Sequence, residues 1–182
     1  MLAGVSSTTS HHMFEALFER RLKPEGDFAR ALRDAGYDPT RYSANYPTLV
    51  WTRCLEVTRV HRYAELSIDD AYRCIGREFT EGYLGTLMGR MISVTLPLMT
   101  PDSFVRRLNS YLRMARSDES LTFHVTWEGP GRIDARVHNP AAVPGTFVAG
   151  LIDAAMSRFG VTWSVEVHQQ TPTDYELRVR WT

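Results

Sequence analysis

Apolar residues recur at helical spacing along the first two thirds of the chain, because side chains three and four positions apart share one helix face. Pro24 and Gly26 separate the first two of these segments. Ser67 stands where it can cap the fourth, with Asp69 and Asp70 at the positive end of that helix. The pattern predicts helices near residues 13–22, 28–35, 46–58, 68–83 and 101–115.

After Ser117 the apolar period changes from that of a helix to two residues. Residues 121–127 and 132–137 alternate between apolar and polar side chains around a Gly-Pro-Gly turn, which predicts a β-hairpin. A helix is predicted over 145–159, followed by two more alternating segments at 161–167 and 175–181. Alternating strands bury one face only. We therefore predict an α+β fold, with N-terminal helices followed by a ββαββ unit whose four-stranded antiparallel sheet packs against helices on one face.

The length of 182 residues favours one domain. We expect residues 1–12, which are polar and contain His11 and His12, to be a flexible N-terminus. The predicted domain spans residues 13–182, with a helical half at 13–116 and a sheet half at 117–182.

Charge and cysteine content narrow the class of protein. Lys+Arg and Asp+Glu both number 21, so a general electrostatic affinity for nucleic acid or anionic membranes is not expected. Cys54 and Cys74 are too few for a disulfide framework, and no apolar run precedes residue 12 to form a signal peptide. The most apolar stretch, Gly82–Met99, is interrupted by Arg90 and Pro97, which favours a buried amphipathic helix over a membrane span. We expect a cytoplasmic protein.

The motifs of common catalytic sites are missing from the sequence. It contains no G-x-x-x-x-G-K-[ST], no G-x-S-x-G and no H-E-x-x-H. We therefore expect no enzyme activity, no metal site and no cofactor. One face of the predicted sheet is polar, and it is either a surface for an anion or partner or, more simply, a solvated face. Its charged and histidine side chains are His124, Arg132, Arg136, His138, Glu166, His168, Arg178 and Arg180.

The helix predicted near residues 68–83 and the segment after it are rich in glycine. Gly76, Gly82, Gly85 and Gly89 fall within fourteen residues, and a glycine inside a helix costs about 1 kcal/mol relative to alanine. This density indicates close approach by another helix, a kink or a bound group. Large apolar side chains with a few polar ones accompany the glycines, as in a pocket for a small apolar ligand, although plain core is the commoner outcome. The candidate ligand-binding residues are Trp51, Phe79, Tyr83, Thr86, Met88, Arg90 and Met91.

Several motifs together resemble a paralogous family of proteins of unknown function from myxobacteria. They include Tyr46-Pro47-x-x-x-Trp51, the closing Arg178-Val179-Arg180-Trp181 and, most specifically, the glycine-rich run between Gly76 and Arg90. The order of elements is also similar to the superfamily of vinyl-reductase-like and haem-nitric-oxide-binding proteins. That similarity implies a module that binds a small molecule or assembles with partners.

Four functions remain open, in decreasing order of preference. The first is a sensor-like ligand-binding or regulatory module in bacterial signalling; the second is a protein-interaction scaffold without a ligand. A haem gas sensor ranks third, because haem-nitric-oxide-binding proteins use Tyr-x-Ser-x-Arg and a helical axial histidine, and no tyrosine here has serine two positions on. An enzyme ranks last. We also expect a homodimer whose interface uses the first helix, with Phe14 and Phe18, or the central glycine-rich helix, since the apolar stripe of the first helix must be buried.

Overall fold

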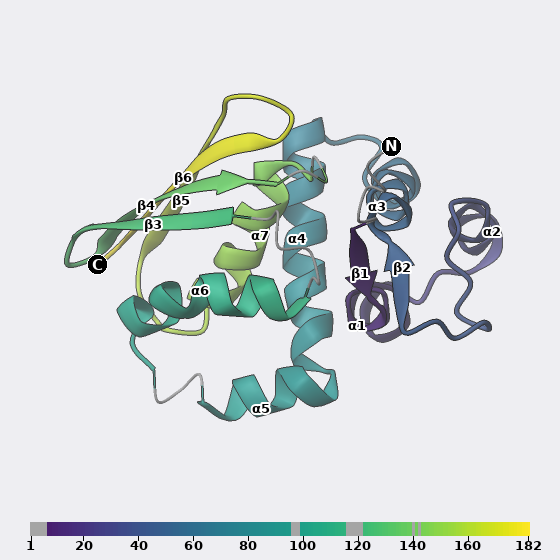
Figure 1. Cartoon of the computed structure of the whole chain (residues 1–182), viewed down its shortest axis with the longest axis horizontal. Helices are drawn as coiled ribbons and strands as arrows, with labels where there is room; N and C mark the ends of the chain where they lie inside the picture. Colours follow the sequence, from purple (N-terminus) through teal and green to yellow (C-terminus); the bar gives the residue numbers. More distant parts are fainter. Residues whose placement is uncertain (1–6, 96–98, 116–121, 140, 142) are drawn as a thin grey trace, which may run out of the picture.

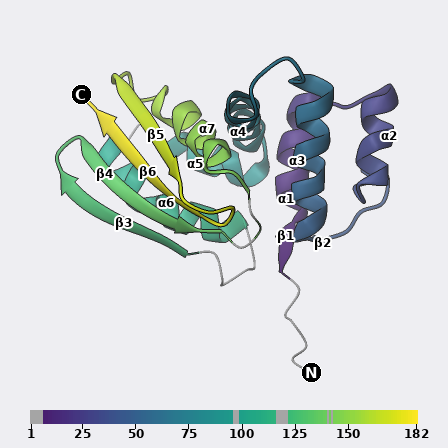
Figure 2. The ribbon, with the colours of Figure 1, turned by 90° about the horizontal axis from the view of Figure 1, so that it is seen from above.

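A central helix, α4 (Ile68–Leu84), separates a helical half of the molecule from a sheet half (Figures 1 and 2). The structure is a computed structural model, and it describes residues 7–95, 99–115, 122–139, 141 and 143–182. The helical half is built from β1 (Thr8–Ser10), α1 (His11–Phe14), a π-helix η1 (Glu15–Leu22), α2 (Gly26–Asp34), β2 (Asn45–Pro47) and α3 (Thr48–Arg62).

The second half contains the predicted four-stranded sheet. After α5 (Leu87–Thr95) and α6 (Pro101–Ala115), it comprises β3 (Thr122–Gly129), β4 (Arg132–His138), α7 (Gly145–Met156), β5 (Trp163–Gln169) and β6 (Asp174–Trp181). The strand order is β3-β4-β6-β5, and all neighbouring strands are antiparallel. Helices cover one face of this sheet (Figure 2). The α+β fold and the ββαββ unit are thereby confirmed.

A small N-terminal sheet was not expected from the sequence. Thr8–Ser10 pairs antiparallel with Asn45–Pro47, and the Thr9 side chain is fully buried. The hydroxyl of Ser7 donates to Thr48 Oγ1 at 2.6 Å, and the His11 amide donates to the carbonyl of Ala44 at 2.9 Å. Residues 8–12 are therefore part of the folded structure and not of a flexible terminus, because a distant segment satisfies their backbone groups.

The first helical segment, α1 and η1, lies in the interior of the single chain. Phe14 is 0% exposed and Phe18 is 1% exposed, and Leu17 beside them is also fully buried. The apolar stripe of this segment is therefore covered by the chain's own α3 and α4. This corrects the expectation that Phe14 and Phe18 form a dimer interface, since neither ring can reach a second copy.

Helices α4 and α7 cross with their backbones in contact. A Cβ atom on Gly76 would lie only 2.1 Å from the carbonyl oxygen of Phe147, and one on Gly150 only 2.1 Å from that of Arg73. Because neither glycine has a side chain, the two helices approach more closely than any other residue would allow. The close approach predicted from the glycine density occurs here, between the helical and sheet halves.

The other glycines of this region have separate roles. Gly82 faces η1, where a Cβ would lie 1.9 Å from the carbonyl oxygen of Ala16. Gly85 ends α4 and meets no neighbouring element, while Gly89 packs against the carbonyl of Tyr83. A crossing or pocket at Gly85 and Gly89 is therefore not found; both belong to the connection from α4 to α5.

A buried carboxylate connects the same two helices to the sheet. Asp153 of α7 is 5% exposed and accepts hydrogen bonds from Arg73 Nε at 2.6 Å and Arg77 Nη2 at 2.8 Å. The indole of Trp163 on β5 donates to the same carboxylate at 3.1 Å. Burial opposes ionisation of Asp153, but the hydrogen bonds from Arg73 and Arg77 outweigh it and hold its pKa below the usual range.

The crossing predicts an unusual sensitivity to the smallest substitution. Gly76→Ala should lower the free energy of unfolding by about 2 kcal/mol or more, because its methyl group forces α4 and α7 apart. Gly85→Ala serves as the control, since its Cβ would meet only the carbonyl of Gly82, at 3.2 Å. Urea unfolding measures both variants. Equal stability of the two would contradict the backbone contact.

Asp153→Asn should destabilise the protein by roughly 3 kcal/mol at neutral pH, because it removes the charge that two guanidinium groups share. A depressed pKa gives stability that is complete above the unfolded value and is lost as pH falls through the folded value. The difference between wild type and variant should therefore shrink below about pH 4. Asp27→Asn, which breaks only an exposed pair with Arg30, is the matched control. Chemical denaturation from pH 7 to pH 2.5 measures the difference in unfolding free energy between wild type and Asp153→Asn. A difference that stays constant over this range would refute this role.

Candidate functional site

A continuous cluster of aromatic rings joins the two halves of the molecule. The ring of Trp51 on α3 lies 5.2 Å from that of Phe14, 6.0 Å from Phe79 on α4 and 6.2 Å from Phe147 on α7. Phe79 and Phe147 are themselves 6.0 Å apart. These edge-to-face and tilted contacts are the arrangements that aromatic pairs favour. Trp51 is therefore one of the residues through which the helical half meets the α4–α7 pair.

Tyr83 lies at the end of this cluster, in the last turn of α4. Its ring stacks on Phe79, with centroids 5.8 Å apart and an interplanar angle of 24°. The side chain is half-buried, and burial raises the pKa of the phenol. Among the described residues the hydroxyl has no hydrogen-bond partner. The hydroxyl is not among the fully buried polar atoms, so it reaches solvent beside the half-buried ring, where a ligand group could bind it.

The structure brings together three of the candidate ligand-binding residues: Trp51, Phe79 and Tyr83. Thr86 is buried nearby, but its hydroxyl donates to the carbonyl of Tyr83 at 2.7 Å and accepts from the amide of Gly89 at 3.1 Å. Thr86 therefore acts as the cap of α5. The side chain of Met88 lies outside the described residues.

Arg90 and Met91 do not join the cluster. Both are exposed on the outer face of α5, where Leu87, Met91 and Val94 are 78%, 64% and 73% exposed. The expected buried helix over Gly82–Met99 is therefore divided: α4 ends at Leu84, and α5 carries an apolar stripe on its outside. No helix in the described part of the chain is long and apolar enough to cross a membrane.

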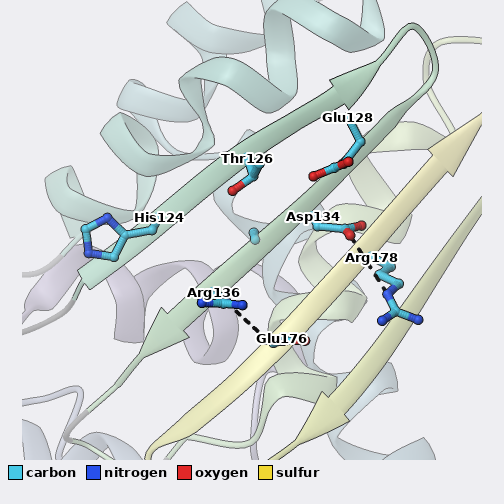
Figure 3. Close-up of a pocket in the computed structure, with 8 residues that line it drawn as sticks. His124, Thr126, Glu128, Asp134, Arg136, Glu176 and Arg178 are labelled. Carbon is cyan, nitrogen blue, oxygen red and sulfur yellow. Dashed lines mark hydrogen bonds and ion pairs between the residues drawn. The ribbon is translucent and has the colours of Figure 1, made fainter.

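The outer face of the sheet carries a shallow hollow of about 450 Å³ (Figure 3). Its lining comes from polar side chains at outward-facing positions of three strands, together with the buried Ala135. The lining residues are His124, Thr126, Glu128, Asp134, Ala135, Arg136, Glu176 and Arg178.

Cross-strand ion pairs neutralise most of this face. Arg136 Nε donates to Glu176 at 3.1 Å, and His138 Nδ1 lies 2.7 Å from a carboxylate oxygen of Asp174. Hydrogen bonds from Thr171 and Thr173, followed by that with His138, lower the pKa of Asp174 to about 2. The remaining cross-strand pairs are Arg178–Asp134 and Arg180–Glu166, and the pairs within one strand are Arg132–Asp134 and His168–Glu166. Such pairing fits a solvated, charge-mixed face better than a site for an anion.

Sequence reasoning missed the Asp153 cluster and the free hydroxyl of Tyr83. Asp153 lies 80 positions from Arg73, so no local pattern relates them. The segment does show arginine at positions 73 and 77, one helical turn apart, which is the only local signal of the pair. Within the described ranges, no group of three or more His, Cys, Asp and Glu side chains is arranged to hold a metal ion.

Comparison with known proteins identifies both a family model and a fold. The model described as "Protein of unknown function (DUF2378)" matches residues 7–182. The curated proteins contain no match. The solved structures include many similar H-NOX proteins, as the element order suggested.

The similarity spans nearly the whole chain, as three of the similar solved structures illustrate. The H-NOX protein of S. oneidensis in the Fe(II)NO ligation state has 13% identity and a TM-score of 0.71, with 95% of this chain and 99% of that chain covered. The Fe(II) unliganded H-NOX protein of K. algicida has 13% identity and a TM-score of 0.69, with 96% of each chain covered. A structure from work on haem redox potential and porphyrin distortion has 11% identity and a TM-score of 0.63, with 94% and 99% covered. At such identities the likeness establishes the fold.

Proposed function

We propose that this chain, which belongs to the DUF2378 family of proteins of unknown function, is a sensor-like module that binds a small, mostly apolar molecule without catalysis. The observation that carries the proposal is the Tyr83 hydroxyl, which is accessible and has no partner among the described residues, on a half-buried ring at the end of the aromatic cluster. A ligand with an apolar body and one hydrogen-bonding group would stack against the Phe79–Tyr83 pair and satisfy that hydroxyl. The similarity to H-NOX proteins supports a sensor role by analogy of fold.

The residues present do not fit a histidine-ligated haem. His11 and His12 begin α1, and His61 stacks on Phe28 at the end of α3. The remaining histidines, His124, His138 and His168, are exposed on the outer face of the sheet. The sequence has no histidine from α4 to α6 and none in α7.

Sulfur ligation is no better supported than histidine ligation. Cys54 is fully buried, and burial raises the pKa of its thiol to about 12, which disfavours a thiolate; Cys74 of α4 is half-buried. The Tyr-x-Ser-x-Arg motif is also missing from the sequence. The proposed ligand is therefore a molecule other than haem.

Native mass spectrometry of the protein purified from its own host tests the proposal. We expect one retained small molecule per chain, and we expect Tyr83→Phe to weaken its binding about fivefold through loss of one hydrogen bond. The melting temperature of Tyr83→Phe should not fall, because the hydroxyl has no partner to lose.

Tyr37→Phe is the matched control for the ligand. Its ring belongs to the same aromatic cluster, but its hydroxyl donates to Glu19 Oε1 at 2.8 Å, so this variant should lose stability and keep the ligand. A wild type that carries no small molecule would overturn the proposal and favour the alternative of a protein-interaction scaffold. Equal ligand loss in both variants would remove Tyr83 from the site.

If no side chain of this protein ligates haem iron, the protein should carry no haem. The protein should purify without Soret absorbance from cells supplied with a haem precursor, and added haem should give no stoichiometric spectral shift. The H-NOX protein of S. oneidensis, expressed and treated identically, provides the positive control. A Soret band at one haem per chain would show that some other side chain ligates the iron.

A further inference from the structure

Strand β3 is a free edge of the sheet. The strand order β3-β4-β6-β5 leaves β3 paired with β4 alone, and Figure 2 shows it on the side of the sheet away from β5. An edge strand presents unpaired backbone N–H and C=O groups that can pair with another strand. Natural edge strands are commonly blocked by lysine, proline or a β-bulge. Strand β3 contains neither lysine nor proline, and its bulge lies at its C-terminal end, between Trp127 and Gly129.

The outward side chains of β3 differ from those of the other three strands. Every ionisable outward side chain of β4, β5 and β6 has an ion-pair partner. On β3, in contrast, His124 and Glu128 are exposed and have no partner among the described residues, and Thr126 between them has no hydrogen bond. Figure 3 shows these three side chains in a row along the edge of the hollow. The unsatisfied polar groups are thus concentrated on the strand that has a free side.

The order of these side chains matches a second copy of the same strand. Along β3 the outward positions are imidazole, hydroxyl and carboxylate, at 124, 126 and 128. If two copies pair antiparallel about a two-fold axis at Thr126, His124 of each lies directly opposite Glu128 of the other. The two Thr126 hydroxyls then meet at the axis, where they can hydrogen-bond to each other. Opposite charges and Thr–Thr pairs are favourable cross-strand neighbours.

We propose that the chain forms a homodimer by antiparallel pairing of β3 with β3 of a second copy. The paired segment is His124–Glu128, and the two sheets become one sheet of eight strands. On the other face the half-buried Val125 of each copy meets Trp127 of the second. Glu128 is the extra residue of the bulge between Trp127 and Gly129, so it has no cross-strand neighbour on β4 and is available to the second copy.

A second copy fits these observations better than an extended peptide from another protein. A strand of arbitrary sequence from another protein could pair with any free edge. Because β5 is also an edge strand, such a partner would have no reason to prefer β3. Two-fold symmetry places the imidazole at position 124 of one copy opposite the carboxylate at position 128 of the other, so this strand is complementary to a second copy of itself. Two-fold symmetry is also the commonest symmetry of soluble oligomers. On β5 the outward Glu166 is already paired with Arg180 and His168.

The register can be tested by exchanging charges. His124→Glu places two carboxylates opposite each other at both symmetric contacts, and we expect it to raise the dimer dissociation constant at least fivefold. The double variant His124→Glu with Glu128→Arg restores opposite charges across the axis and should return the constant to within about twofold of wild type. Sedimentation velocity over a concentration series measures all three proteins. Both positions are exposed, so the melting temperatures should stay the same when measured at a concentration at which all three proteins are monomeric.

Ser164→Glu is the matched control, because it adds the same charge to an exposed position of the other edge strand, β5. It should leave the dissociation constant unchanged. The proposal is overturned if the wild type stays monomeric up to about 200 µM, a concentration at which even a weak dimer would form. A monomer would instead assign the β3 edge to a strand of another protein. The proposal also fails if His124→Glu has no effect, if Ser164→Glu weakens the dimer equally, or if the double variant does not recover.

Discussion

The contact between the backbones of α4 and α7 fixes the relation between the two halves of the molecule. Gly76 and Gly150 allow this contact, and all the connecting features depend on it. The same pair of helices carries Phe79 and Phe147, which meet Trp51 of the helical half. It also carries the groups around Asp153 that reach β5. If α4 and α7 were further apart, neither the aromatic contacts nor the buried ion pair could keep these distances.

The elements with long, regular periodicity could be predicted from the sequence, because their spacing depends only on which face is buried. The ββαββ unit and the helices around α3, α4 and α6 are of this kind. The strand Thr8–Ser10 could not be predicted, since three polar residues are stabilised by hydrogen bonds from a segment nearly forty positions away. Glycine density predicted a close helix contact, but not that Gly76 makes it while Gly85 ends α4. Which glycine lies at a contact depends on the neighbouring helix.

Of the candidate site, only the aromatic residues could be predicted from the sequence. Trp51, Phe79 and Tyr83 lie on the inward faces of their helices, so helical spacing correctly grouped them. Arg90 and Met91 were misplaced because the chain turns between Leu84 and Leu87, and residues after the turn belong to a new helix with its own inner face. The positions of Phe14 and Phe18 could not be predicted from periodicity either. An apolar stripe must be buried, but its spacing does not show whether the same chain or a second chain covers it.

The two surfaces to which we assign binding are physically separate. The aromatic cluster with Tyr83 lies among the helices, whereas His124, Thr126 and Glu128 are on the face of the sheet that the helices do not cover (Figures 2 and 3). None of the described residues of one set contacts the other, so substitutions in the two sets should have additive effects. A ligand beside Tyr83 would act on the last turn of α4. Helix α4 meets the sheet through Arg73, which binds Asp153 of α7 and donates to the carbonyl of Val165 on β5. The edge strand β3 is at the opposite side of that sheet. Dimerisation through β3 therefore leaves the α4–β5 contacts free to respond to a bound molecule.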